Sequence, residues 1–211
     1  MAAVCTRIFD YGQKEMNELT RKDAVLGAAI TRLGKVERIV MPDVFSALIH
    51  AIIGQLISAK AAHVLWERML AQFEEITPTY LSQQTPEAIQ KCGITLKKAA
   101  TIHHISQSIA AGAYRLDDLH TLSDEDVIHR LTMLKGVGRW TAEMILIHAL
   151  ERPDVISWGD VAIRRGMMKL YGLPALTQDQ FEQYRLRYSP LGSIASIYFW
   201  AISSDSSKVV Y

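Results

Sequence analysis

Residues 134–144 read LKGVGRWTAEM, in which a Gly-x-Gly pair is followed closely by a tryptophan. Helical patterns flank it on both sides, so we expect one helix to end at Leu134 and the next to begin at Arg139. Gly136 and Gly138 allow φ > 0 and let another backbone approach closely. The first amide groups of the second helix have no partners within the helix and lie at its positive end. The stretch therefore predicts a helix-hairpin-helix with an anion site at its corner, and a DNA phosphate fits such a site without base contacts.

The residues around this corner supply further candidates for phosphate and cation binding. Seven residues are assigned to phosphate binding: Lys135, Gly136, Val137, Gly138, Arg139, Thr141 and Arg164. The backbone carbonyls of Thr132, Leu134 and Val137 could together hold a sodium or potassium ion that bridges to the phosphate. The alternative is a plain glycine-rich turn that joins two packed helices, because a Gly-x-Gly pair alone is a weak motif.

The remaining sequence favours an all-α fold. In the range 41–58, Val44, Leu48, Ile52 and Leu56 recur on one helical stripe, which predicts a helix. Further helical patterns occupy 59–75, 96–114, 123–134, 139–151, 160–172, 177–188 and 190–204, and two short helices occupy 77–94. The expected N-caps of three of these helices are Ser58, Ser123 and Thr177. We find no convincing period-2 strand pattern and no internal repeat.

Composition limits the classes of protein that need to be considered. A chain of 211 residues, of which 49% are hydrophobic, is long enough for a well-buried core. Its net charge of +1 means that nucleic acid would be bound locally rather than by a polycationic surface. No apolar run approaches the roughly 20 residues that cross a bilayer, so no membrane partner is expected. Cys5 and Cys92 fit a reducing compartment and exclude both a disulfide framework and a four-cysteine metal cluster.

Asp160 is the candidate catalytic residue. It follows Trp140 by twenty residues and stands directly before a helical pattern, which predicts that it is the N-cap of that helix. The amides and the helix dipole there would keep its carboxylate ionised. A fixed anion can stabilise positive charge that develops at a sugar C1′, or can orient a water molecule. Capping alone is the alternative reading. We expect the side chains of Trp140 and Asp160 to converge on one cavity at the mouth of the glycine corner.

Two further stretches make a resemblance specific. LKGVGRWTAEM, followed at this distance by SWGDVAIRRG (157–166), resembles the hairpin and catalytic-aspartate region of the helix-hairpin-helix DNA glycosylase superfamily. AIIGQLISAKAA (51–62) resembles the segment with which that family wedges DNA where a base is removed. The resemblance covers most of the chain, from about residue 20 to residue 203, and is closest to the DNA-3-methyladenine glycosylase II branch.

The resemblance implies a fold and its division along the chain. We expect one compact, all-α, two-lobed glycosylase unit over residues 1–211, with the active-site cleft between the lobes. Residues 1–20 would form an N-terminal extension, 123–150 the helix-hairpin-helix, and 157–171 the start of the helix that carries the catalytic aspartate.

The resemblance also implies an activity. Members of this branch act in base excision repair: they flip alkylated purines, such as 3-methyladenine and 7-methylguanine, out of duplex DNA and hydrolyse the N-glycosidic bond. Bifunctional members of the superfamily carry a lysine nucleophile where this chain has Trp140. The implied enzyme is therefore monofunctional, lacks lyase activity and leaves an abasic site. The resemblance and the pattern together assign a base pocket to Trp140, Met144, Trp158 and His50, and a DNA wedge to Gln55 and Leu56.

No required cofactor is implied. Some relatives hold a four-cysteine iron–sulfur cluster near the C-terminus, but this chain has no cysteine after Cys92. The implied partner is double-stranded DNA that contains alkylated bases, and the protein is expected to be a monomer. Its compartment would be the cytoplasm and nucleoid of a bacterium or the nucleus of a eukaryote.

The chain departs from the family pattern at several positions. Met144 stands where some relatives have an aromatic residue, Leu191 where some have a tryptophan, and Gly159 where a second aspartate is frequent. These differences leave the breadth of the base pocket open. Two other functions also remain open: a glycosylase for oxidised or deaminated bases, and a non-catalytic module that uses the hairpin only to grip DNA. Leu56 and Trp140 could also be ordinary core residues.

Overall fold

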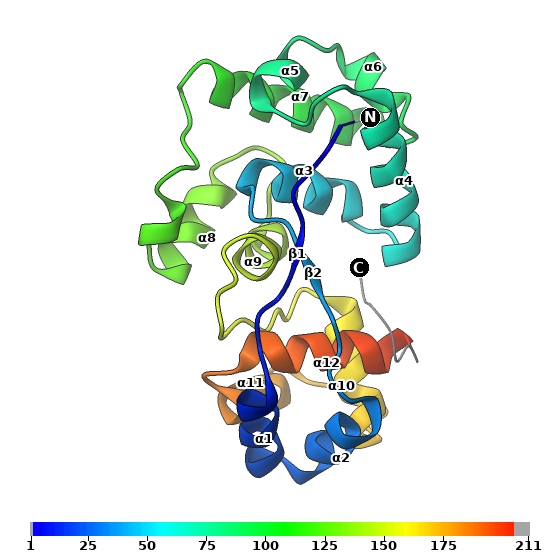
Figure 1. Cartoon of the computed structure of the whole chain (residues 1–211), viewed down its shortest axis with the longest axis vertical. Coiled ribbons are helices and arrows are strands. Elements are labelled where there is room, and N and C mark those ends of the chain that lie inside the picture. The colour runs from blue at the N-terminus through cyan, green and yellow to red at the C-terminus, as the bar shows by residue number, and fades with distance from the viewer. Residues whose placement is uncertain (1, 205–211) are drawn as a thin grey trace. The chain divides into compact units, whose positions relative to one another are not determined.

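Helices make up nearly all the regular structure of the computed structural model, which describes residues 2–204 (Figure 1). The α-helices are α1 (Gln13–Lys22), α2 (Ala24–Leu33), α3 (Val44–Gly54), α4 (Ala59–Gln72), α5 (Pro78–Ser82), α6 (Pro86–Gln90), α7 (Leu96–Ala110), α8 (Asp124–Thr132), α9 (Arg139–His148), α10 (Val161–Tyr171), α11 (Gln178–Tyr188) and α12 (Gly192–Ser204). A short 3-10 helix, η1 (Leu119–Thr121), precedes α8. Strands β1 (Arg7–Ile8) and β2 (Ile39–Val40) pair in a two-stranded sheet. The expected all-α class is confirmed.

Side-chain caps explain why many of these helices begin where they do. The hydroxyl groups of Ser58, Ser123 and Thr177 each accept a hydrogen bond from the backbone N–H three residues later, so all three expected N-caps are confirmed. Thr77 and Thr85 do the same for α5 and α6, and a proline follows each of them at the first helical position. These caps satisfy amide groups that a helix cannot satisfy internally.

The described residues divide into two compact units. The first comprises the chain up to Arg7 together with Met41–Leu150, and it contains α3 to α9. In this unit α3 lies against α4, α7 and α9, while α7 also packs against α5 and α6 and α8 packs against α9. Leu48 and Ile52 of α3 are fully buried and belong to the core of this unit.

The second unit is assembled from two separate stretches of chain, Ile8–Val40 and Glu151 onward. It contains α1, α2, α10, α11 and α12, and its tightest packing joins α10 to α12. A Cβ atom at Gly166 of α10 would lie 2.1 Å from the carbonyl oxygen of Phe199 on α12, so glycine lets the two backbones touch. Phe181, Tyr188 and Tyr198 are fully buried in this unit.

The segment expected to form an N-terminal extension, residues 1–20, is divided between the two units. The chain up to Arg7 belongs to the first unit, whereas Ile8 onward belongs to the second, in which α1 begins at Gln13 and packs against α2 and α11. Asp23 links the two helices, because it ends α1 and its carboxylate caps α2 by accepting from the N–H of Leu26. No helix between residues 2 and 204 is long and apolar enough to cross a bilayer.

Candidate functional site

The expected hairpin is present in the first unit, with small differences in geometry. Helix α9 begins at Arg139 as expected, whereas α8 ends at Thr132, two residues earlier than expected. Gly136 has φ +89°, and a Cβ there would lie 2.8 Å from the side chain of Thr101. Gly138, the N-cap of α9, has φ −99°, so of the two glycines only Gly136 uses the positive φ that glycine allows. A Cβ at Gly138 would meet nothing within 4 Å, so no other part of the protein covers this face of the residue.

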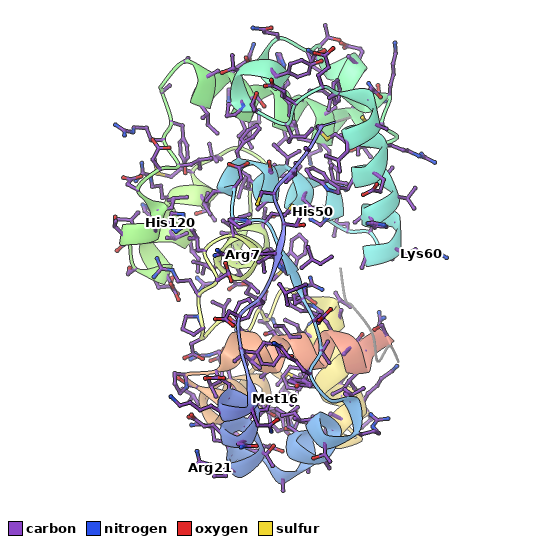
Figure 2. The ribbon with its side chains drawn as sticks, viewed as in Figure 1. Arg7, Met16, Arg21, His50, Lys60 and His120 are labelled. Carbon is purple, nitrogen blue, oxygen red and sulfur yellow. The ribbon has the colours of Figure 1, made fainter. Side chains whose placement is uncertain are left out.

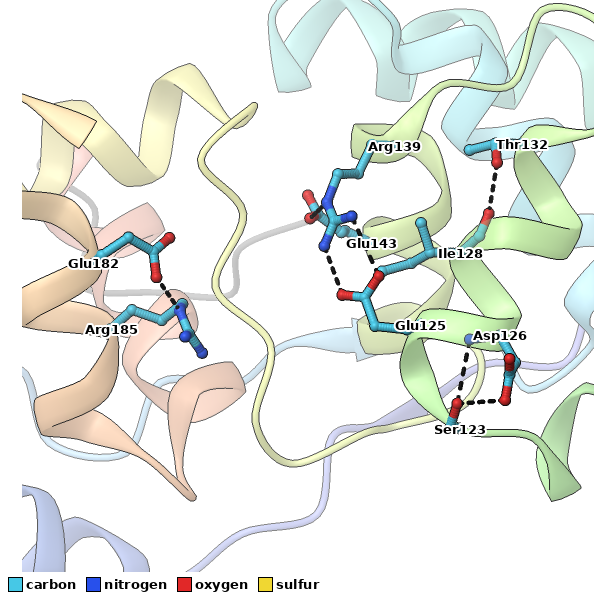
Figure 3. Close-up of polar contacts among 9 residues, drawn as sticks. All are labelled: Ser123, Glu125, Asp126, Ile128, Thr132, Arg139, Glu143, Glu182 and Arg185. Carbon is cyan, nitrogen blue, oxygen red and sulfur yellow. Dashed lines mark hydrogen bonds and ion pairs between the residues drawn. The ribbon is translucent and has the colours of Figure 1, made fainter. Parts of the chain in front are cut away.

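The charges at the hairpin are partly neutralised within the protein. The guanidinium of Arg139 lies 2.8 Å from a carboxylate oxygen of Glu125 on α8 and 2.9 Å from one of Glu143 on α9 (Figure 3). These carboxylates, Glu125 first, raise the pKa of Arg139. Lys135 is exposed, and the carbonyl of Leu134 accepts a hydrogen bond from the N–H of Val137. The Arg139 guanidinium is therefore already paired with two carboxylates within the protein. Its phosphate-binding role stays a prediction, and so does the alkali-cation site.

Leu56 is displayed on a turn directly after α3 rather than packed on its apolar stripe. Helix α3 ends at Gly54, and Leu56 then takes φ +59° with its side chain fully exposed. The alternative reading of Leu56 as a core residue is therefore wrong, and its assignment to the DNA wedge stays a prediction. The helical stripe of Val44, Leu48 and Ile52 does not extend to Leu56, because the backbone leaves the helical conformation at Gln55.

Two side chains hold this turn in place. The Gln55 amide nitrogen donates to the carbonyl of Gly136 and to the hydroxyl of Thr141, each at 3.0 Å, and so ties the turn to the hairpin. From α7, the Lys98 ammonium donates to the carbonyls of Ile53 at 2.8 Å and Gln55 at 2.7 Å. Burial lowers the pKa of Lys98. Thr141, which was expected to bind phosphate, is itself buried beneath this contact.

Lys98 was not anticipated from the sequence. It is the second of two adjacent lysines near the start of α7, and periodicity alone does not show which of them points toward α3.

The base-pocket candidates of the first unit are distributed over α3 and α9. Trp140 is half-buried in the first turn of α9, and a Cβ at Gly54 would lie 3.9 Å from its ring. Met144, one turn later, is almost fully buried. His50 of α3 (Figure 2) places its ring edge-to-face with Trp66, with the ring centroids 5.2 Å apart. The Trp140 ring therefore lies near Gly54, the last residue of α3 and the start of the turn that carries Leu56. Met144, in contrast, belongs to the core.

The second unit contains the candidate acid. Asp160 is the N-cap of α10, as expected, and only 7% of it is exposed. Its Oδ1 accepts hydrogen bonds from the backbone N–H of Ile163 at 2.9 Å and from the indole Nε1 of Trp200 at 3.2 Å. The indole of Trp200 in turn lies under the guanidinium of Arg38, whose Cζ is 4.2 Å from the ring centroid. The convergence of Trp140 and Asp160 on one cavity stays a prediction.

Arg38 and Trp200 were not identified from the sequence as part of this group. Both are nearly buried, and burial lowers the pKa of the Arg38 guanidinium to about 10 while the charge of Asp160 opposes this. The available signal was general: a buried tryptophan N–H needs a hydrogen-bond partner, and a buried arginine needs a counter-charge.

Trp158 and Arg164, expected in the base pocket and at the phosphate respectively, contact each other. The Arg164 guanidinium lies 4.7 Å from the centroid of the Trp158 ring, and Phe181 packs edge-on against the same ring. One face of Trp158 is thus covered by a cation. Both roles stay predictions. Across residues 2–204, no cluster of three or more histidine, cysteine, aspartate or glutamate side chains could hold a metal ion.

Comparison with known proteins places the chain in a family. Residues 49–190 match the model of the HhH-GPD superfamily of base excision DNA repair proteins. The match covers more than half of the chain, so the protein belongs to this superfamily. The resemblance found in the hairpin and aspartate segments is confirmed.

Its relatives with known names include several glycosylases. The chain is 32% identical to DNA-3-methyladenine glycosylase 1 of Schizosaccharomyces pombe over 79% of this chain and 76% of that protein. It is 28% identical to DNA-3-methyladenine glycosylase 2 of Escherichia coli over 75% of this chain and 57% of that protein.

Solved structures share the fold. The S. pombe 3-methyladenine DNA glycosylase Mag1 in complex with abasic DNA superposes with a TM-score of 0.80 and 26% identity, covering 90% of this chain and 96% of that chain. DNA-3-methyladenine glycosidase from Bacillus halodurans superposes with a TM-score of 0.74 and 28% identity, covering 96% of both chains.

Proposed function

We propose that this protein is a monofunctional DNA glycosylase that removes alkylated purines from duplex DNA by hydrolysis and leaves an abasic site. The observation that carries the proposal is Asp160, a nearly buried carboxylate that caps α10 and accepts two N–H donors. A carboxylate that only capped a helix would function equally well at the surface. The relatives named as 3-methyladenine glycosylases support alkylated purines as the substrate class.

The first unit supplies the grip on DNA. The uncovered Gly138 and the positive end of α9 suit one phosphate, and the nearby Lys135 adds an exposed charge. Leu56, displayed on a turn tied to the hairpin by Gln55, enters the space that the extruded nucleotide leaves. Trp140 offers an aromatic face, which attracts a cationic alkylated base by roughly 0.5–2 kcal/mol.

The chemistry requires little proton transfer. When the C1′–N bond breaks, its electron pair goes to the base, which departs neutral because alkylation had already made it cationic. The sugar becomes an oxocarbenium ion, and the proposed role of Asp160 is to stabilise that positive charge. Water adds to C1′ and loses a proton, either to the Asp160 carboxylate or to solvent. Trp140 occupies the position of the lysine nucleophile in bifunctional relatives, so no covalent step that could lead to strand cleavage is proposed.

The test compares Asp160→Asn with the unchanged protein. Asparagine is an equally good N-cap, so the fold of the second unit should persist. Loss of the carboxylate should slow release of 3-methyladenine and 7-methylguanine from alkylated duplex by roughly 10²–10³-fold, as expected when an electrostatic stabiliser is removed. Binding to the same duplex should survive. Asp179→Asn, which changes an exposed acid in the first turn of α11, is the matched control and should excise normally.

A lesion panel separates this proposal from its alternatives. Duplexes that each hold one 3-methyladenine, hypoxanthine, 8-oxoguanine or uracil are incubated with the protein, with and without later alkali. Release of the alkylated base with strand breaks only after alkali supports the proposal. Activity confined to 8-oxoguanine or uracil, strand nicking without alkali, or full excision by Asp160→Asn would overturn it.

A further inference from the structure

The second unit contains a buried cation that the proposed chemistry does not yet use. Arg38 directly precedes β2, and only 7% of it is exposed. Arginine is rarely buried to this extent unless it is paired with an anion. Its guanidinium lies over the indole of Trp200, and the charge of Asp160 acts on it. The buried positive charge is therefore located in the same group of side chains as the candidate catalytic acid.

Trp200 joins this cation to the acid. Its indole, 6% exposed, presents one face to Arg38 and donates its N–H to Oδ1 of Asp160 at 3.2 Å. The backbone N–H of Ile163 donates to the same oxygen at 2.9 Å. These two donors, one on α10 and the other on α12, restrict rotation of the carboxylate. The orientation of the Asp160 side chain therefore depends on α12 as well as on α10, the helix that it caps.

The close contact between α10 and α12 allows Trp200 on α12 to donate its hydrogen bond to Asp160 at the start of α10. Gly166 brings the backbone of α10 against the carbonyl of Phe199, the residue directly before Trp200. Fixing the α12 backbone at this point also fixes where the Trp200 side chain begins. The distance from indole nitrogen to carboxylate is thereby determined by backbone packing rather than by flexible side chains.

We propose that Arg38 and Trp200 are positioning residues for Asp160: Trp200 directs the carboxylate through its N–H, and the cationic Arg38, stacked on the indole, holds Trp200 in place. The proposal rests on the proposed function, since it assumes that Asp160 stabilises the sugar cation. A carboxylate that points away from the sugar cannot do this, because its charge must lie close to the developing cation. Burial lowers the pKa of Arg38 only to about 10, so the guanidinium remains charged at neutral pH.

Three substitutions separate the two roles. Trp200→Phe keeps an aromatic ring beneath Arg38 and removes only the N–H donor. Arg38→Met removes the charge and keeps a side chain of similar length, whereas Arg38→Lys keeps the charge. Arg185→Met is the control, because Arg185 lies on α11 of the same unit, partly exposed and paired with Glu182 (Figure 3).

A positioning role predicts a slower chemical step with unchanged DNA binding, whereas a purely structural role predicts that both are impaired. Single-turnover excision of 7-methylguanine at saturating enzyme reports the chemical step, and affinity for a duplex with a tetrahydrofuran abasic analogue reports binding. Trp200→Phe should slow excision roughly 10- to 100-fold, as for a lost hydrogen bond to a charged group, with affinity nearly unchanged. Arg38→Met should be at least as slow, and Arg38→Lys should recover part of the rate. Arg185→Met should match the unchanged protein.

A double-mutant comparison completes the test. In an Asp160→Asn background, neither Trp200→Phe nor Arg38→Met should slow excision further, because both are proposed to act through that carboxylate. The proposal is overturned if the single variants excise at the unchanged rate, if they slow the Asp160→Asn enzyme by the same factor, or if Arg38→Lys is as slow as Arg38→Met. If the unchanged protein releases no alkylated base, the proposed function itself has failed.

Discussion

Leu56 has a strained backbone conformation and a fully exposed side chain. We therefore expect Leu56→Gly to raise the stability of the free protein and to lower its excision activity. An L-residue at φ +59° costs roughly 1–2 kcal/mol, which glycine avoids. Glycine in turn loses more freedom on folding, at a cost of roughly 0.5–1 kcal/mol. Because the side chain is fully exposed, no burial is lost. Leu56→Gly should therefore stabilise the free protein by about 0.5–1 kcal/mol, or roughly 1–4 °C in Tm.

The same substitution should impair excision from duplex DNA. A leucine that enters the base stack buries apolar surface worth roughly 1.5–3 kcal/mol. Its loss should reduce the population of extruded nucleotide, and so the excision rate, roughly 10- to 100-fold. A lesion in single-stranded DNA needs no wedge, so its release should change much less.

Leu56→Ala is the informative control. Alanine removes the wedge but keeps the unfavourable φ, so it should match Leu56→Gly in excision without the gain in stability. Thermal unfolding and single-turnover excision are measured for both variants. If alanine lowers Tm by several degrees, Leu56 packs against the protein and the geometric reasoning is wrong. If both variants excise at the unchanged rate from duplex DNA, the wedge role is wrong.

Three further predictions concern the supports of the two units. Lys98→Met should destabilise the first unit by about 1–3 kcal/mol in urea unfolding, because two carbonyls lose their donor. Gly166→Ala should cost at least about 1–3 kcal/mol, since its Cβ would overlap the carbonyl of Phe199; unchanged stability would contradict the close helix contact. Burial raises the pKa of Asp23, but hydrogen bonds from a backbone N–H, Arg187 and a tyrosine hydroxyl outweigh this and hold it below its ordinary value of 3.8. The resulting stability is present above about pH 4 and is lost as the pH falls through the lowered pKa. Asp23→Asn should therefore destabilise the protein by about 1–3 kcal/mol at pH 7, and by progressively less as the pH is lowered below about 4 in urea unfolding.

Local chemistry is what sequence reasoning predicted well. The N-caps at Ser123, Asp160 and Thr177 depend on a side chain and an amide three residues away, so a short stretch of sequence contains the whole interaction. The start of α9 at Arg139 follows from the same logic. Family membership could also be predicted, because the hairpin and the aspartate segment each form a continuous motif.

Interactions between distant segments are what sequence reasoning missed. Leu56 continues the apolar spacing of α3, and nothing in that spacing shows that the helix has already ended at Gly54. Arg38 and Trp200 come from opposite ends of the chain and meet only because the second unit is built from both. Pairing of Arg139 with two glutamates could be proposed from helical spacing only for Glu143, four residues later, and not for Glu125 across the hairpin.

The interrupted construction of the second unit has a consequence for synthesis. The stretch Met41–Leu150, which forms nearly all of the first unit, leaves the ribosome as one continuous piece. The second unit must wait for Glu151 onward, and the indole that donates to Asp160 belongs to α12, the last helix among the described residues. Since domains generally fold as they are made, a nascent chain can complete its hairpin before its acid has any support. A polypeptide that stops short of α12 would retain the elements proposed to hold a phosphate and lack the indole proposed to orient the catalytic acid.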